Sequence, residues 1–128
     1  VLVSSCQKDD DGNNGVDSGD SRALYIGNWV CVEQSQIYAT STYPVIINPH
    51  SSISNRVTVD YFYNIQTQGA LVQFEINGNN INIFPQNVNG FNISGSGTML
   101  NSSEIHLSYT ADDGSGVDNV TAVYTKTN

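Results

Sequence analysis

The chain has 128 residues and 12 Asp or Glu side chains against four Lys or Arg, which gives a formal net charge of −8. That length allows one domain of roughly 100 to 130 residues and an extension, but not two separate cores. A protein this acidic repels phosphate, so nucleic acid is excluded as an expected partner. Hydrophobic residues make up 38% of the chain, which is enough for one modest core. No run approaches the roughly 18 to 20 apolar residues that span a bilayer as a helix.

The first 22 residues differ in composition from the rest. They carry five of the 12 acids and three Gly but no aromatic residue. Such a segment buries too little apolar surface to offset the roughly 1 to 2 kcal/mol needed to order each residue. We therefore expect a flexible acidic tether over residues 6–22 and one folded domain over 23–128.

Cys6 follows an aliphatic stretch, Val1 to Val3, and two small residues, Ser4 and Ser5. The order of these residues resembles the lipobox of bacterial lipoproteins. The resemblance implies that residues 1–5 are the end of a signal peptide, that cleavage occurs before Cys6, and that lipid on its thiol (palmitate or a similar acyl chain) anchors the protein to a membrane. The alternative is a disulfide between Cys6 and Cys31, since these are the two Cys of the chain.

The residues directly after Cys6 are Gln7, Lys8, Asp9, Asp10 and Asp11. This run resembles the export signal of Bacteroidota lipoproteins, in which a Gln-Lys-acidic sequence follows the lipidated Cys. The resemblance implies an outer-membrane lipoprotein exposed at the cell surface. A position on the periplasmic face of the membrane is the alternative.

From residue 23 onward, apolar and polar residues alternate with a period of two, which is typical of half-buried strands. No window shows the spacing of an amphipathic helix. Turn residues such as Asn77-Gly78-Asn79 and Asp112 to Gly116 separate the apolar runs. The predicted strands are 25–33, 43–48, 56–63, 70–77, 80–84, 91–100, 104–111 and 118–126.

Along the predicted strands every second residue is apolar, as at Val57, Val59 and Tyr61, and the residues between them are polar. A single sheet that curls around its own core has one buried and one wet face. We therefore predict an all-β fold, an antiparallel up-and-down barrel of about eight strands. A two-sheet β-sandwich is the alternative, because periodicity does not distinguish the two.

Gly27 and Trp29 lie on the first predicted strand. They resemble the Gly-x-Trp opening of the lipocalin and calycin barrels, in which the Trp closes one end of the barrel. The resemblance implies a lipocalin-like barrel over 23–128 and a basic side chain from the last strand stacked on the Trp. Lys126 is the one basic residue of the last predicted strand.

The sequence offers no pattern that predicts catalysis, a cofactor or a metal site. His50 and His106 are far apart, and no Ser or Cys has the flanking pattern of an activated nucleophile. Cys31 shares parity with Trp29 and is expected to be a buried apolar side chain. Within the predicted strand 91–100, Gly95 and Gly97 indicate a bulge or a bend.

Glu33 is the one acid of the domain whose parity places it inside, towards a barrel mouth. Tyr61, Phe74, Tyr109 and Tyr124 could line a cavity there. Two functions stay open at this point. One is a non-enzymatic binding module for a small apolar ligand, a glycan or a protein. The other is a structural or interaction lipoprotein whose barrel is filled by its own side chains.

Overall fold

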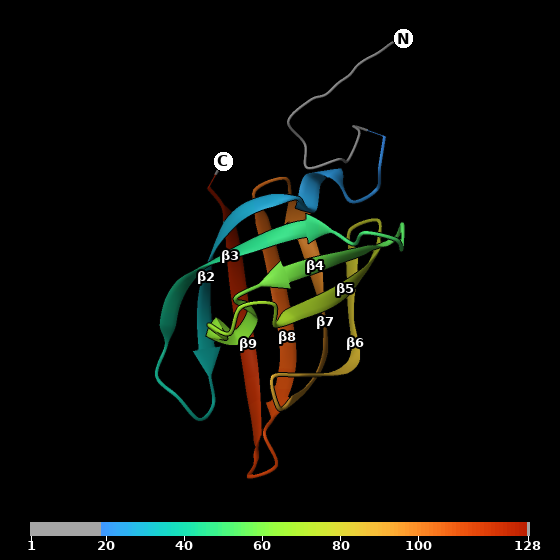
Figure 1. The fold of residues 1–128 in the computed structure, drawn as a ribbon. Helices are drawn as coiled ribbons and strands as arrows, with labels where there is room; N and C mark the ends of the chain where they lie inside the picture. Colours follow the sequence, from blue (N-terminus) through green and yellow to red (C-terminus); the bar gives the residue numbers. More distant parts are fainter. Residues whose placement is uncertain (1–18, 128) are drawn as a thin grey trace.

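The computed structural model describes residues 19–127 and consists of one antiparallel sheet (Figure 1). Two short 3-10 turns accompany the strands: η1 (Ala23–Tyr25) and η2 (Phe62–Asn64). The strands are β2 (Gly27–Ser35), β3 (Ser41–Pro49), β4 (Arg56–Asp60), β5 (Leu71–Asn77), β6 (Asn80–Val88), β7 (Phe91–Asn101), β8 (Glu104–Asp112) and β9 (Val117–Lys126). The residues of the predicted signal peptide, of Cys6 and of the export signal lie outside the described part of the chain.

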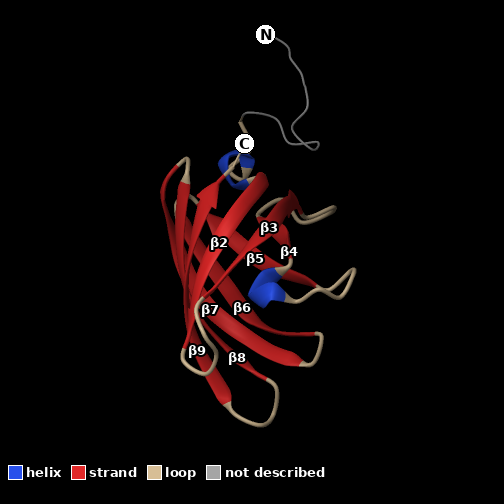
Figure 2. Ribbon diagram, turned by 90° about the vertical axis from the view of Figure 1, so that its left-hand side faces the viewer, coloured by secondary structure: helices blue, strands red, loops and turns tan. Residues whose placement is uncertain are grey.

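The sheet closes on itself. Each strand from β2 to β9 is antiparallel to the next, and β9 returns to pair with β2 (Figure 2). In that last pairing Glu33 lies opposite Ala122. Closure leaves no strand edge open to pairing with another molecule. The predicted eight-stranded up-and-down barrel is therefore confirmed, and the β-sandwich is excluded.

The core follows the alternation of the sequence. In β8, for example, Ile105, Leu107, Tyr109 and Ala111 are buried, and the residues between them face outwards. Buried side chains come from every strand of the barrel, and the large aromatic residues Trp29, Phe74 and Tyr124 are almost completely enclosed. The interior is thus packed with side chains along the barrel.

Strand β7 approaches β8 closely at two glycines, Gly95 and Gly97. A Cβ at Gly95 would overlap the carbonyl oxygen of Ser108 and would lie 2.5 Å from the Cα of Tyr109. A Cβ at Gly97 would lie 2.5 Å from the carbonyl oxygen of His106. Only glycine permits this approach of two backbones.

The structure differs from the predicted strand 56–63 after residue 60. Strand β4 ends at Asp60, and Tyr61, Tyr63 and Asn64 adopt left-handed backbone angles with φ of 68°, 57° and 56°. For bulky residues this conformation is strained, at a cost of about 1 to 3 kcal/mol each. The turn interrupts the alternation of inward and outward side chains, so that Phe62 is buried and Tyr61 is only partly buried. The prediction that Tyr61 lines the interior was wrong for this reason.

Two further boundaries differ from the prediction. Strand β6 continues past Pro85 to Val88, across an irregularity of register between Ile83 and Gln86. At the start of the chain, Arg22 is buried rather than part of an open tether, since it packs onto the connection between β3 and β4. The folded body therefore begins before residue 23.

Candidate functional site

One end of the barrel is closed by Trp29, and we call it the Trp29 end. The ammonium group of Lys126 lies 4.8 Å from the centre of the Trp29 ring and donates hydrogen bonds to the carbonyls of Ile26 (2.8 Å) and Leu24 (2.9 Å). Trp29 Nε1 donates to the carbonyl of Tyr25 (2.9 Å). A basic side chain of the last strand therefore stacks on the Trp. Partial burial lowers the pKa of Lys126.

Residues 20–25 join the barrel at this same end. Arg22 forms an ion pair of 2.7 Å with Asp20 and donates hydrogen bonds to the carbonyls of Ile53 and Arg56. The hydrogen bond from Arg22 lowers the pKa of Asp20. The Tyr25 phenol donates to the carbonyl of Gly78 (2.8 Å). These bonds fix the point at which the chain enters the barrel.

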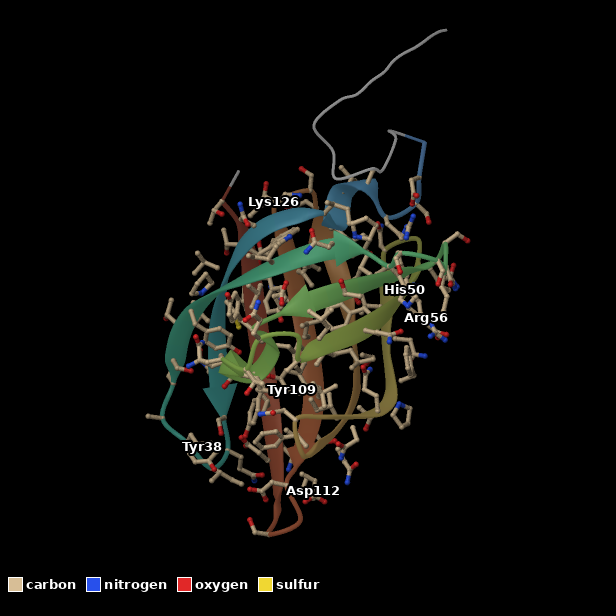
Figure 3. All side chains as sticks on the ribbon, viewed as in Figure 1. Tyr38, His50, Arg56, Tyr109, Asp112 and Lys126 are labelled. Atoms are coloured by element: carbon tan, nitrogen blue, oxygen red, sulfur yellow. The ribbon has the colours of Figure 1, made fainter. Side chains whose placement is uncertain are left out.

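The opposite end contains the connections 36–40, 61–70, 89–90 and 113–116, and we call it the Glu33 end. Figure 3 shows Lys126 and Arg56 towards one end of the barrel and Asp112 at the other. The Lys and Arg residues of the described chain are Arg22, Arg56 and Lys126, and all three lie towards the Trp29 end. The Glu33 end carries carboxylates, among them Asp112 and Asp118.

Glu33 lies inside the barrel and is 5% exposed. Its Oε1 accepts a short hydrogen bond from the Tyr43 phenol and a second one, of 2.9 Å, from the Tyr109 phenol. Burial raises the pKa of both tyrosines well above the usual value, so both remain protonated donors at neutral pH. The residue opposite Glu33 on β9 is Ala122.

Phe62 covers this cluster from the side of η2. Its ring lies 4.4 Å from that of Tyr109 and 5.7 Å from that of Phe74, the latter in an edge-to-face arrangement. Phe62 is 0% exposed. It is therefore a plug that the 61–64 turn inserts into the barrel.

Asp118 holds the plug in place. Tyr63, the residue after the plug, donates a 2.6 Å hydrogen bond from its phenol to Asp118, which also accepts from the hydroxyl of Ser35 (2.5 Å) and the N–H of Gln36 (2.9 Å). Burial raises the pKa of Asp118, but these bonds and one from the N–H of Ile37 outweigh it and lower the pKa below its usual value. Two connections of the Glu33 end thus share one carboxylate.

The structure brings together most of the residues predicted to line a cavity. Glu33, Phe74, Tyr109 and Tyr124 are all buried inside the barrel, whereas Tyr61 is not. Four residues of this end were not predicted from the sequence: Tyr43, Phe62, Tyr63 and Asp118. The inward parity of Tyr43 with Val45 and Ile47 is a signal that could have found the first of these. No pattern marks the other three, because they depend on the left-handed turn.

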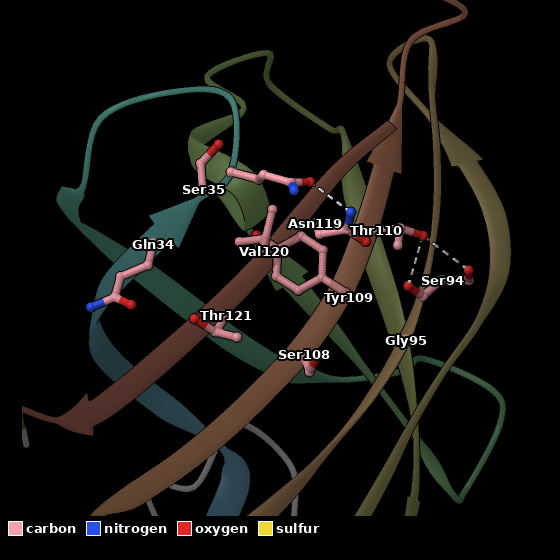
Figure 4. A pocket seen from close by; sticks show the side chains of 11 residues that line it. Gln34, Ser35, Ser94, Gly95, Ser108, Tyr109, Thr110, Asn119, Val120 and Thr121 are labelled. Atoms are coloured by element: carbon pink, nitrogen blue, oxygen red, sulfur yellow. Dashed lines mark hydrogen bonds between the residues drawn. The ribbon is translucent and has the colours of Figure 1, made fainter. Parts of the chain in front are cut away.

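Two grooves lie on the outer surface of the barrel. One has a volume of about 560 Å³ and spans β2, β7, β8 and β9 (Figure 4). Its polar walls include Gln34, Ser108 and Thr121. The adjoining groove has a volume of about 430 Å³ and includes Asn87 among its lining residues. Uncharged hydroxyl and amide groups predominate in the first groove.

Burial or hydrogen bonds within the barrel account for Cys31, His50 and His106 without a ligand. Cys31 is a free, buried thiol whose pKa is raised by burial to about 12, so it is not a reactive nucleophile in the folded barrel. His50 accepts hydrogen bonds from the N–H groups of Ser52 and Ile53. His106 lies 2.6 Å from Glu104 on the surface.

Within residues 19–127, no three His, Cys, Asp or Glu side chains gather as metal ligands. The same residues include no helix long and apolar enough to cross a membrane.

Comparison with known proteins supports the fold. No family model matches the chain, and a search of curated proteins found no match. Among solved structures, the chain is similar to a redesigned β-barrel, with a TM-score of 0.62 and 12% identity. The similarity covers 88% of this chain and 100% of that one. At this identity the likeness shows the barrel fold and nothing of function.

Proposed function

We propose that this protein is a lipid-anchored, surface-exposed lipoprotein whose barrel acts as a non-enzymatic binding module through its Glu33 end. The anchor is the lipidated Cys6, and the Gln-Lys-acidic run after it is the export signal. The binding partner in this proposal is a small apolar ligand, a glycan or a protein, and no nucleic acid.

The contrast between the two ends of the barrel carries the proposal. The Trp29 end is closed by Trp29, Lys126 and Tyr25, and it receives the N-terminal segment through Arg22. The Glu33 end is closed by one strained turn with a single aromatic plug. An anchor at Cys6 then attaches to the Trp29 end and leaves the Glu33 end free to meet partners.

The anchor can be tested in cells. Labelled palmitate is expected to enter the wild-type protein but not a Cys6→Ala variant, and equal labelling of both would contradict the proposal. Surface exposure predicts that protease added to intact cells removes the domain. Protection of the domain until the cells are lysed would place it on the periplasmic face.

Binding can be tested by a thermal-shift screen of the full chain against lipids, amines and glycans, because a ligand that binds only the folded state raises its melting temperature. Ligands of the Glu33 end should lose their effect on Phe62→Trp, in which a larger plug occupies the site. A glycan in the outer groove should instead be lost on Thr121→Lys, which projects into that groove. A screen with no stabilising compound would contradict the binding function.

The packed core favours a second candidate, a structural or interaction lipoprotein with a filled barrel. Trp29, Phe62 and Phe74 are each 0% exposed and fill the interior along its length. This candidate predicts no stabilising small molecule and a protein partner on the outer surface. Chemical crosslinking on intact cells distinguishes the two candidates, since a partner protein would be captured by wild-type and Phe62→Trp alike.

A further inference from the structure

We infer that the cluster of Glu33, Tyr43 and Tyr109, once the Phe62 ring leaves it, is a binding site for an organic ammonium ion with an aromatic or apolar tail. The site becomes accessible when the 61–65 segment moves away from the barrel mouth. This inference rests on the proposed binding function and names the class of ligand.

The first support is the state of the buried carboxylate. A carboxylate removed from water is costly unless a cation or several hydrogen bonds compensate it. The ion pairs of the described residues are those of Asp20, Glu75 and Glu104, and none involves Glu33. Both hydrogen bonds of the Glu33 carboxylate converge on Oε1, and none of the described bonds reaches Oε2. Oε2 is not among the buried polar atoms left without a partner, so solvent reaches this side of the carboxylate, and an ammonium group bound there would supply the counter-charge that no ion pair of the described residues gives Glu33.

The second support is the aromatic wall around the carboxylate. Tyr43 and Tyr109 touch it through their phenols, and the ring of Phe62 packs on Tyr109. The ring of Tyr63 lies 6.2 Å from that of Tyr109. Aromatic faces attract cations and also accept apolar tails. A carboxylate inside an aromatic wall therefore matches an amine with an apolar tail better than it matches a neutral lipid or an anion.

The third support is the nature of the plug. The ring of Phe62 occupies the position that an aromatic tail would take beside Phe74 and Tyr109. It is held there by a turn with strained left-handed residues and by the bond from Tyr63 to Asp118. The closed state is therefore raised in energy by its own backbone, which lowers the free energy that a ligand must supply to displace the plug.

The fourth support is the charge of the entrance. Asp112, Asp113 and Asp118 lie at the Glu33 end, and the Lys and Arg side chains of the described residues lie towards the other end. Such an arrangement raises the local concentration of cations and repels anions. The charge of the entrance and that of the interior thus favour the same class of ligand.

Calorimetry with a matched pair of probes tests the inference in the full chain. The probes are 2-phenylethylammonium and 2-phenylethanol, which share a ring and differ in charge. Wild type is expected to bind the ammonium at least tenfold more tightly than the alcohol. Glu33→Gln, which keeps an acceptor for the two phenols, should abolish this preference. The control variant Glu104→Gln removes one negative charge from the surface of the Trp29 end and should keep the preference for the ammonium probe.

Two variants test the plug itself. Tyr63→Phe removes the bond to Asp118 but keeps the ring, so it should bind both probes several-fold more tightly, whereas a simple loss of contact would weaken binding. Phe62→Ala should also bind both probes more tightly and should retain the preference for the ammonium, which keeps the test decisive if Glu33→Gln does not fold.

Three results would overturn the inference: equal affinity of wild type for the two probes, an ammonium preference that survives in Glu33→Gln, or no binding of either probe by wild type and Phe62→Ala. If another compound of the thermal-shift screen stabilises the barrel in that last case, the ligand class is wrong and the binding function stands. If no compound of the screen stabilises the barrel, both the ligand class and the binding function are wrong.

Discussion

The phenol of Tyr63 donates a 2.6 Å hydrogen bond to Asp118 and so joins two residues that are 55 positions apart in the chain. The same carboxylate accepts bonds from Ser35 and from the backbone of Gln36 and Ile37. One buried acid thus orders the connection between β2 and β3 together with the turn that carries Phe62. The geometry of the Glu33 end depends on this carboxylate.

Asp118 should make the stability of the protein sensitive to acid. Its pKa is lower in the folded state than the unfolded value of about 3.9. The stability it contributes is therefore fully present above the unfolded pKa and is lost as the pH falls through the folded pKa. We expect the free energy of unfolding to decrease as the pH falls below about 4. Urea denaturation between pH 7 and pH 2 measures this.

Asp118→Asn should lower the free energy of unfolding at pH 7 by about 1 to 3 kcal/mol, because it removes charge-assisted hydrogen bonds. It should also lose less stability in acid than wild type does. An unchanged acid response in Asp118→Asn would mean that other carboxyl groups dominate the response.

Tyr63→Phe should loosen the plug with little effect on the rest of the barrel. We expect a loss of about 1 kcal/mol in the free energy of unfolding, which is typical of one hydrogen bond. Amide hydrogen exchange should accelerate at Asn64 and Ile65, whose N–H groups bond within the turn, and remain unchanged in β8. Tyr38→Phe is the control, since Tyr38 is 61% exposed. Faster exchange in both variants would contradict the role of the Tyr63–Asp118 hydrogen bond in holding the 61–64 turn.

Lys126 should be needed to close the Trp29 end. Lys126→Met removes the charge over the Trp29 ring and two hydrogen bonds to backbone carbonyls. We expect a loss of about 1 to 2 kcal/mol in the free energy of unfolding. Trp29 is the single Trp of the chain, so its fluorescence reports on this end directly. Lys126→Arg should keep most of the stability, and a similar loss in both variants would contradict a role for the charge.

Gly95→Ala should be strongly destabilising. Its Cβ would overlap backbone atoms of Ser108 and Tyr109, which cannot move without breaking the pairing of β7 and β8. We expect a loss of about 3 kcal/mol. Gly116→Ala is the matched control, because no atom lies within 4 Å of its Cβ position, and it should change stability by less than about 0.5 kcal/mol. Thermal melts of both variants give the comparison.

The strand pattern was sufficient to predict an all-β fold of about eight antiparallel strands, whereas the choice of a barrel over a sandwich depended on the pairing of β9 with β2. Alternation placed Val57, Phe74 and Tyr109 on the inner face, and hairpin-length turns indicated neighbouring antiparallel strands. Even the inward position of Glu33 followed from its shared parity with Trp29 and Cys31. These properties are local in the sequence and have the period of the pleat, so a single chain is enough to infer them.

The details of the Glu33 end could not be predicted in the same way. Tyr61 and Tyr63 have left-handed backbone angles that aromatic residues rarely adopt, and tertiary contacts impose those angles. The change of parity at Phe62 and the partnership of Tyr63 with Asp118 follow from that turn. A residue pair so far apart in the sequence leaves no periodic signal.

The ion pair between Asp20 and Arg22 determines where a pulling force enters the barrel. Any pull on the preceding residues reaches Arg22 before it reaches β2, and Arg22 transmits the load to the carbonyls of Ile53 and Arg56. The force therefore enters the barrel through the β3–β4 connection, across several hydrogen bonds at once, instead of peeling β2 away from its neighbours one bond at a time. A protein held by its N-terminal segment could then bear drag on the barrel without opening the sheet.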